Sequence, residues 1–268
     1  MVREVAAPIT GLRPIETFIL PSSIGALFDD HRPEEVVALP WNMLPPLDEV
    51  ADQAMIDASD IIDPAYFELQ AGRDDRLHKH EREVGALLSV TLSDQAIPAI
   101  LKTIMSAYGL VHDGGKTTPQ MQKEYNDPGK WLPGKVDRLS RQHEALGEEQ
   151  FAYFASQDGA HFAALSIARL IGGHHQRDLA AIQDPRVRWM VATFQEADSS
   201  QSILLDERKY MNDGTTREGI SLNDVTTLER TIVKPFQAPH YFGIHPGRIF
   251  NAALGYRDQR IAQLRAGA

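Results

Sequence analysis

The chain has no cysteine among its 268 residues. This absence excludes disulfides, thiolate metal ligands and a cysteine nucleophile. A chain of this length buries well over half of the surface that it exposes when unfolded, so its core needs no covalent cross-links. We therefore expect one domain that is held together by its hydrophobic core.

Long apolar runs are also missing. No stretch approaches 18 consecutive apolar residues, and the first residues, MVREVAAPIT, lack the apolar run and small-residue cleavage site of a signal peptide. The sequence therefore gives no sign of contact with a membrane, and we expect a cytoplasmic protein.

Positive charge is scarce, because 27 Lys and Arg face 37 Asp and Glu and leave a net charge of -10. Open, non-specific binding of nucleic acid depends on clustered Lys and Arg that neutralise phosphates. The charge balance disfavours such a surface. It favours a small anionic substrate, or a nucleic acid that is gripped mainly at bound metal ions.

Proline is concentrated at the front of the chain, where seven prolines in residues 1–46 prevent long helices. We expect this segment to be irregular and to pack on a helical domain that spans residues 47–268. Within that domain apolar residues recur at helical spacing, as Val84, Leu87 and Leu88 do, and this pattern continues to about residue 210. The sequence therefore predicts an all-α fold without internal repeats.

Three local features refine this prediction. Ser93 is expected to cap the helix that follows it. The dense β-branched residues over 218–235 favour a small β-hairpin, and Pro246 is a favourable start for a last helix over 247–265.

The most informative motif is His112-Asp113-Gly114-Gly115-Lys116, which directly follows an apolar helical pattern. An aspartate beside a histidine can bridge two cations while the imidazole binds one of them. The two glycines allow the backbone to turn sharply and to approach a ligand closely, and Lys116 is then placed to meet a phosphate.

Other candidate ligands occur before and after this motif at nearly even intervals. Any one histidine alone is more often a hydrogen-bonded core or surface residue. The prediction of a shared metal site therefore depends on the order and spacing of the candidates. Helices that face one another can deliver such residues to a common point. The candidates are His80, His143, His174, His175 and Asp198.

Several histidines are alternatives or outsiders. His78 competes with His80, but two residues on a helix point about 200° apart, so only one can face the metals. We prefer His80 because Val84 follows it at four residues. His161 is interpreted as a packed or supporting residue, and the remaining histidines, in loop-like contexts, as structural or substrate-facing: His31, His240 and His245. The loop with Tyr125 and Trp131 covers either the site or the core.

The order His, His-Asp, His, His-His, Asp resembles the HD superfamily of metal-dependent phosphohydrolases over residues 76–210. In its fuller form it is similar to the HD domains of HD-GYP phosphodiesterases and of CRISPR-associated helicase-nucleases. His112-Asp113-x-Gly115-Lys116 and Ala197-Asp198-x-x-x-Ser202 carry the resemblance most specifically. No Gly-Tyr-Pro follows the histidine pair, which counts against cyclic di-GMP as substrate. We expect no helicase within these 268 residues, which leaves a nuclease role open but unsupported.

The resemblance implies an HD-type helical bundle with a binuclear metal centre. One metal would be held by His80, His112, Asp113 and Asp198, and Asp113 would bridge to a second metal held by His143, His174 and His175. Asp113 and Lys116 would serve catalysis, and Glu144 and Glu196, the carboxylates nearest in sequence, would orient imidazoles. Histidine-rich ligands suit Mn, Fe, Co, Ni or Zn.

The expected activity is hydrolysis of a phosphate ester or phosphodiester, with a nucleotide or oligonucleotide as substrate and a water activated by two metals. Two alternatives remain open. One is a mixed-valent di-iron oxygenase built on the same ligands, and the other is a non-catalytic module that senses a nucleotide.

Overall fold

The structure is a computed structural model, and it describes most of the chain between residues 44 and 267. The described residues are 44–71, 75–93, 97–119, 121–122, 135–155, 161–176, 178–206, 211–212, 215–216 and 247–267. An irregular segment was expected over residues 1–46. Residues 1–43 lie outside this part, and residues 44–46 are loop.

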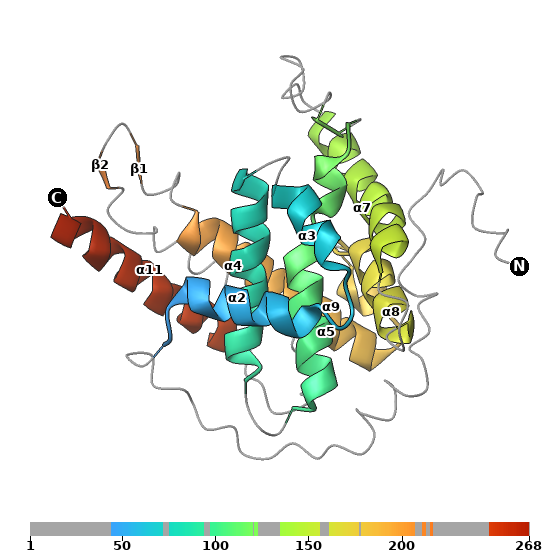
Figure 1. The fold of residues 1–268 in the computed structure, drawn as a ribbon, viewed down its shortest axis with the longest axis horizontal. Helices are drawn as coiled ribbons and strands as arrows, with labels where there is room; N and C mark the ends of the chain where they lie inside the picture. Colours follow the sequence, from blue (N-terminus) through green and yellow to red (C-terminus); the bar gives the residue numbers. More distant parts are fainter. Residues whose placement is uncertain are drawn as a thin grey trace, which may run out of the picture.

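The described residues form an all-α domain, as the sequence predicts (Figure 1). Its α-helices are α2 (Leu47–Ala58), α3 (Pro64–Ala71), α4 (Asp75–Thr91), α5 (Ala99–Val111), α7 (Lys135–Phe154), α8 (His161–Ile171), α9 (Pro185–Ser200) and α11 (Gly247–Gly267). Short 3₁₀ turns cover Gly114–Thr117 and Leu179–Ala181, and a π-helical turn, Gln201–Leu205, continues α9.

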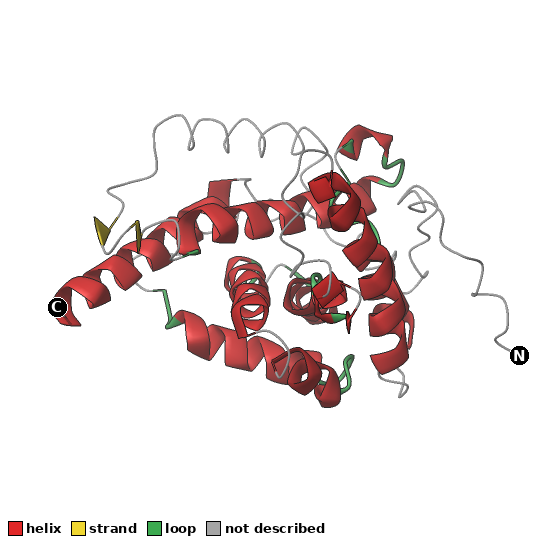
Figure 2. Ribbon diagram, turned by 90° about the horizontal axis from the view of Figure 1, so that it is seen from above, coloured by secondary structure: helices red, strands yellow, loops and turns green. Residues whose placement is uncertain are grey.

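Helices α4 and α5 lie side by side at the centre, and the perpendicular view shows them nearly end-on with other helices around them (Figure 2). They approach closely because two glycines face each other: a Cβ on Gly109 would lie 2.9 Å from the Cα of Gly85. Every residue of α5 from Ile104 to Val111 is buried. The close pairing brings His80 of α4 next to His112, which follows α5.

The remaining helices enclose this pair. Helix α2 packs on α4 and α5, α8 packs on α5 and α7, and α11 packs on α4, α9 and the π turn. Tyr108 of α5 contacts both α8 and α9, because its ring stacks on Phe194 of α9 and its hydroxyl donates to the Leu170 carbonyl of α8. The ends of α5, α8 and α9 are thereby fixed relative to one another.

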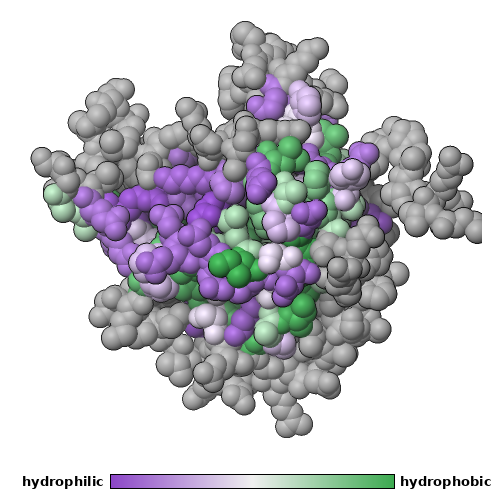
Figure 3. Space-filling model, in the orientation of Figure 1, coloured by the Kyte–Doolittle hydropathy of each residue, from purple (hydrophilic) through white to green (hydrophobic). Residues whose placement is uncertain are grey.

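Most apolar residues face inward. On the face of Figure 3, hydrophilic residues gather over the half where Figure 1 places α11, and hydrophobic residues occur in small patches among them. None of the described helices is long and apolar enough to cross a membrane.

One local prediction is wrong, and another lies outside the described residues. The prediction that Ser93 caps a helix is wrong, because its hydroxyl donates to the Val90 carbonyl at the end of α4, whereas α5 begins after Pro98. The hairpin expected over 218–235 lies outside the described residues. A short antiparallel pair, β1 (Met211–Asn212) with β2 (Thr215–Thr216), lies before it.

Gly115 sets the distance between the turn after α5 and helix α7. A Cβ at this position would lie 1.9 Å from the His143 carbonyl oxygen and 2.6 Å from the Gly147 nitrogen, and both of these are backbone atoms. We expect Gly115→Ala to lower the free energy of unfolding by about 3 kcal/mol, the upper range for overpacking of a core. Urea denaturation followed by circular dichroism measures this change.

Gly172→Ala is the matched control. Its new Cβ would meet the carboxylate end of the Glu148 side chain, which can move aside. Equal destabilisation by the two substitutions would contradict the steric argument for Gly115.

Candidate metal centre

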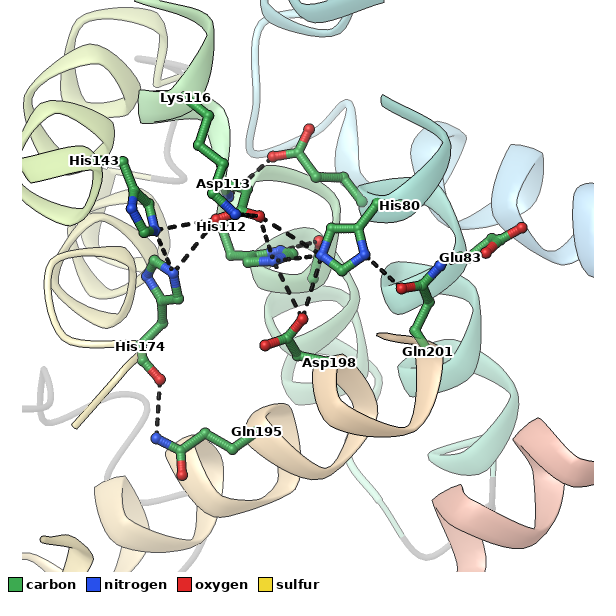
Figure 4. Close-up of polar contacts among 12 residues, drawn as sticks. His80, Glu83, His112, Asp113, Lys116, His143, His174, Gln195, Asp198 and Gln201 are labelled. Carbon is green, nitrogen blue, oxygen red and sulfur yellow. Dashed lines mark hydrogen bonds and ion pairs between the residues drawn. The ribbon is translucent and has the colours of Figure 1, made fainter. Parts of the chain in front are cut away.

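The structure brings the seven predicted ligand residues to one end of α5, and Figure 4 labels all of them except His175. They come from three helices and two turns: His80 from α4, His112 and Asp113 after α5, His143 from α7, His174 and His175 after α8, and Asp198 from α9. The ligand atoms of six of them, all but Asp198, form two groups that share Asp113, and within each group these atoms lie within 4.8 Å of one another.

The first group contains His80, His112 and Asp113. His80 Nε2 and His112 Nε2 are 3.2 Å apart. Asp113 Oδ2 lies 3.6 Å from His80 Nε2 and 3.5 Å from His112 Nε2. Asp198 adjoins this group, with its Oδ1 3.2 Å from His80 Nε2 and 3.9 Å from His112 Nε2.

The second group contains Asp113, His143, His174 and His175. Asp113 turns its other oxygen, Oδ1, toward this group, at 3.2 Å from His143 Nε2 and 3.5 Å from His174 Nε2. The two imidazole nitrogens are 3.1 Å apart. Asp113 therefore has one oxygen in each group, the arrangement of a carboxylate that bridges two cations.

Hydrogen bonds fix which nitrogen of three histidines faces the centre. His112 donates from Nδ1 to the Gly109 carbonyl at 2.8 Å, and His174 donates in the same way to the Ile171 carbonyl at 2.7 Å. His80 donates from Nδ1 to the side-chain oxygen of Gln201 at 2.5 Å. In its neutral form each of these rings thus presents the lone pair of Nε2 to the centre.

These lone pairs and carboxylate oxygens fit a cation. In the first group two nitrogen lone pairs and Asp113 Oδ2 converge, and in the second Asp113 Oδ1 is buried and accepts no hydrogen bond of normal geometry from the described residues. Two ligand atoms bound about 2.1 Å from one cation, at 90–110° to each other, are about 3.0–3.4 Å apart. The nitrogen pairs at 3.1 and 3.2 Å match this spacing.

The protonation of the imidazoles also suits metal binding. Burial lowers the pKa of His112 to about 3, and burial together with the charge of His174 lowers the pKa of His175 to about 4. These rings are neutral near pH 7, the form that binds metals. For His80 burial acts in the same direction, but the hydrogen bond and charge of Asp198 raise its pKa above the usual value.

Asp113 is held by its neighbours as an ionised carboxylate. Burial alone would raise its pKa, but the ammonium group of Lys116 holds the pKa well below its usual range. Lys116 Nζ makes a direct ion pair with Asp113 Oδ2. The backbone N–H of Asp113 donates to Glu81 Oε1 at 3.0 Å, which anchors the residue from the α4 side.

Three supporting residues of the centre were not predicted from the sequence. Glu81 anchors Asp113, Gln201 orients His80, and Gln195 donates to the carbonyls of His174 and Gln176 at 2.9 and 2.8 Å. The predicted role of Glu196 is not borne out, because its carboxylate bonds no described imidazole. The role of Glu144 stays a prediction.

Glu196 is instead a buried acid in the core. Burial raises its pKa well above the usual value, and the Phe250 backbone amide of α11 acts in the opposite direction. Because the folded pKa lies above the unfolded one, stability is fully present below the unfolded pKa and is lost as the pH rises. We expect Glu196→Gln to raise the free energy of unfolding at pH 8 by about 1–3 kcal/mol. At pH 4 the same substitution should change the free energy of unfolding little.

Thermal and urea unfolding over pH 4–8 measure this difference. Glu149→Gln is the matched control, since Glu149 is exposed on α7. A gain from Glu196→Gln that is the same at every pH would contradict the burial of a charge at this position.

The other histidines are placed as follows. His78 is partly buried on α4 and belongs to neither group. The side chain of His161 and all of His31, His240 and His245 lie outside the described residues, as does the segment with Tyr125 and Trp131.

One family model matches this chain. Residues 74–225, more than half of the chain, match the family model described as the Cas3 HD domain. This range contains the six residues of the two groups, Asp198 and Lys116. No curated protein and no solved structure gives a significant match.

Proposed function

The chain belongs to the Cas3 HD-domain family of metal-dependent nucleases, and from this premise we propose that it hydrolyses phosphodiester bonds of nucleic acid at the two ligand groups. The single observation that carries the proposal is the shared carboxylate of Asp113, with one oxygen in each group. When bound, two divalent cations supply an activated water and neutralise charge on the phosphoryl group.

The first cation is assigned to His80, His112, Asp113 and Asp198. The second is assigned to Asp113, His143, His174 and His175. Neutral imidazoles and carboxylates are ligands for Mn, Fe, Co, Ni or Zn, and we propose a divalent ion from this set.

Burial indicates how a substrate reaches the centre. His112, Asp113, His143 and His174 are nearly inaccessible, with side chains at most 2% exposed. The side chains of His80, Asp198 and Lys116 are 19, 21 and 25% exposed, and His175 is exposed. We infer that a phosphodiester enters from this open side.

Lys116 is the side chain placed to meet the substrate's charge. Its ammonium group already pairs with Asp113, and at 25% exposure it also reaches solvent. In the proposed reaction it donates to a non-bridging phosphate oxygen and stabilises the charge that develops there. Because the chain is acidic overall, we expect the grip on nucleic acid to be concentrated at this centre.

The test is a cleavage assay with chain that has been stripped by chelator and reloaded with Mn²⁺. Substrates are single-stranded DNA, duplex DNA, single-stranded RNA and a chromogenic phosphodiester. We expect cleavage of at least one nucleic acid, lost on chelation and lost in the double variant His112→Ala with Asp113→Ala purified in parallel.

His78→Ala and His80→Ala form a matched pair for this assay. The two residues are two positions apart on α4, and His80 belongs to a ligand group while His78 does not. We expect His80→Ala to lose activity and His78→Ala to keep it. Equal turnover by the double variant, or oxygen uptake with bound iron and no cleavage, would overturn the proposal.

A further inference from the structure

His80 is held differently from the other oriented histidines. His112 and His174 donate from Nδ1 to the carbonyl three residues earlier in their own segment, so local backbone fixes them. His80 donates instead to a side chain 121 residues away, that of Gln201. The orientation of His80 therefore depends on how distant parts of the chain pack.

Gln201 is itself held by a further pair of residues. Its amide nitrogen donates to Glu83 Oε2 at 2.6 Å, so its oxygen is the atom left to accept from His80. Arg260 of α11 donates to the other oxygen of Glu83 at 2.7 Å and to the Leu205 carbonyl at 2.6 Å. Gln201 and Glu83 are buried, at 4 and 3% exposure, so little solvent competes with these bonds.

Gln201 lies where α9 passes into the π turn, and its backbone N–H still bonds to the Ala197 carbonyl of α9. Asp206 N–H bonds to the Gln201 carbonyl at 3.1 Å, five residues back, in the wider turn that follows α9. Single π turns inside or after α-helices are frequent at functional sites. Asp198 and Gln201, three residues apart at this junction, lie against the two nitrogens of the His80 imidazole.

We propose that Gln201 is a positioning residue for His80, and that α11, through Arg260 and Glu83, sets the cation affinity of the His80 group. Helix α11 lies outside the range that matches the family model, so this control belongs to a part of the chain beyond the matched domain. The inference rests on the proposed metal centre and is independent of which nucleic acid is cut.

The first readout needs no metal. Nitrogen-15 NMR of histidine-labelled, chelator-treated chain above pH 8.5 reports the protonated nitrogen of each ring. We expect Gln201→Leu to remove the Nδ1–H signal of His80 and to leave those of His112 and His174 unchanged. A merely structural role for Gln201 would shift all three or none.

The second readout is calorimetric titration with Mn²⁺. Partners that orient a ligand histidine commonly contribute 10–100-fold to metal affinity, so we expect Gln201→Leu to weaken one cation by about 10–100-fold. The other cation, held by the group of His143 and His174, keeps its affinity within about twofold. Arg260→Ala should weaken the same cation, while Arg257→Ala, on the same helix but paired with exposed Asp258, should not.

A double exchange provides the rescue. Gln201→Glu alone sets a carboxylate against Glu83, and Glu83→Gln alone removes the charge that Arg260 pairs with, so each single change should weaken the His80 cation. Together they restore every bond: the carboxylate at position 201 accepts from His80, and the amide at position 83 donates to it and accepts from Arg260. We expect the double variant to recover at least half of the affinity that the single changes lose, measured as the change in the logarithm of the Kd for the His80 cation.

The outcomes are separable. An unchanged His80 signal in Gln201→Leu, equal weakening of both cations, or no recovery in the double exchange would overturn the inference. Absence of Mn²⁺ binding by the unaltered chain would overturn the metal centre and this inference together. Intact binding without nuclease activity would overturn the proposed function and leave this inference standing.

Discussion

Replacing Asp113 with asparagine is expected to abolish metal binding in both groups and to lower the cleavage rate by about 10³-fold or more, since metal ions contribute several kcal/mol to such reactions. The reason is the position of the carboxylate: Oδ2 faces His80 and His112, and Oδ1 faces His143 and His174. An amide keeps the shape, but it loses the charge and one of the two ligand oxygens.

Metal-dependent stabilisation gives this prediction a readout apart from catalysis. A ligand that binds only the folded state raises the melting temperature. Mn²⁺ should therefore raise that of the unaltered chain and leave that of Asp113→Asn almost unchanged. Asp57→Asn, an exposed change on α2, is the control and should respond like the unaltered chain.

Single-ligand variants sharpen the same test. We expect His112→Ala to lose the first cation and His174→Ala to lose the second, whereas Asp113→Asn loses both. If Asp113→Asn still bound two Mn²⁺ per chain by calorimetry, the carboxylate would not be the bridge and the division into two groups would be wrong.

The convergence of the candidate ligands could be predicted from the sequence, because each of them lies where a helical pattern ends or where an apolar face fixes the helix. Val84, four residues after His80, packs in the core, and this is the spacing that distinguished His80 from His78. The doublet His112-Asp113 directly follows the continuously buried stretch Ile104–Val111 of α5, so its placement inside the bundle follows from the burial of α5.

The supporting residues were not accessible, because helix geometry rather than sequence proximity selects them. Glu196 is two residues from Asp198, which on a helix is about 200° away, so it faces α11 instead of the imidazoles. Gln201, three residues after Asp198, shares its face, and that spacing is a signal that could have identified it. Glu81 gave no such signal, because only the packing of α4 on α5 brings it to the Asp113 backbone.

The role of Lys116 leads to a second large effect, in which activity and metal affinity change independently. Lys116 pairs with Asp113 Oδ2, the oxygen that faces the first group. Removing one fixed charge that stabilises a transition state commonly costs about 10²–10³-fold in rate, so we expect a loss of this size in kcat for Lys116→Ala.

Metal affinity should not fall with it. The ammonium group repels cations that lie beside Asp113, and it competes with them for the same carboxylate oxygen, so its removal should leave Mn²⁺ affinity unchanged or raise it. Lys116→Arg keeps the charge and should retain more of the rate than Lys116→Ala. Calorimetry and cleavage kinetics on the same preparations compare the two quantities. A parallel loss of Mn²⁺ binding and rate would mean that Lys116 acts by holding Asp113 in place and not by contacting the substrate.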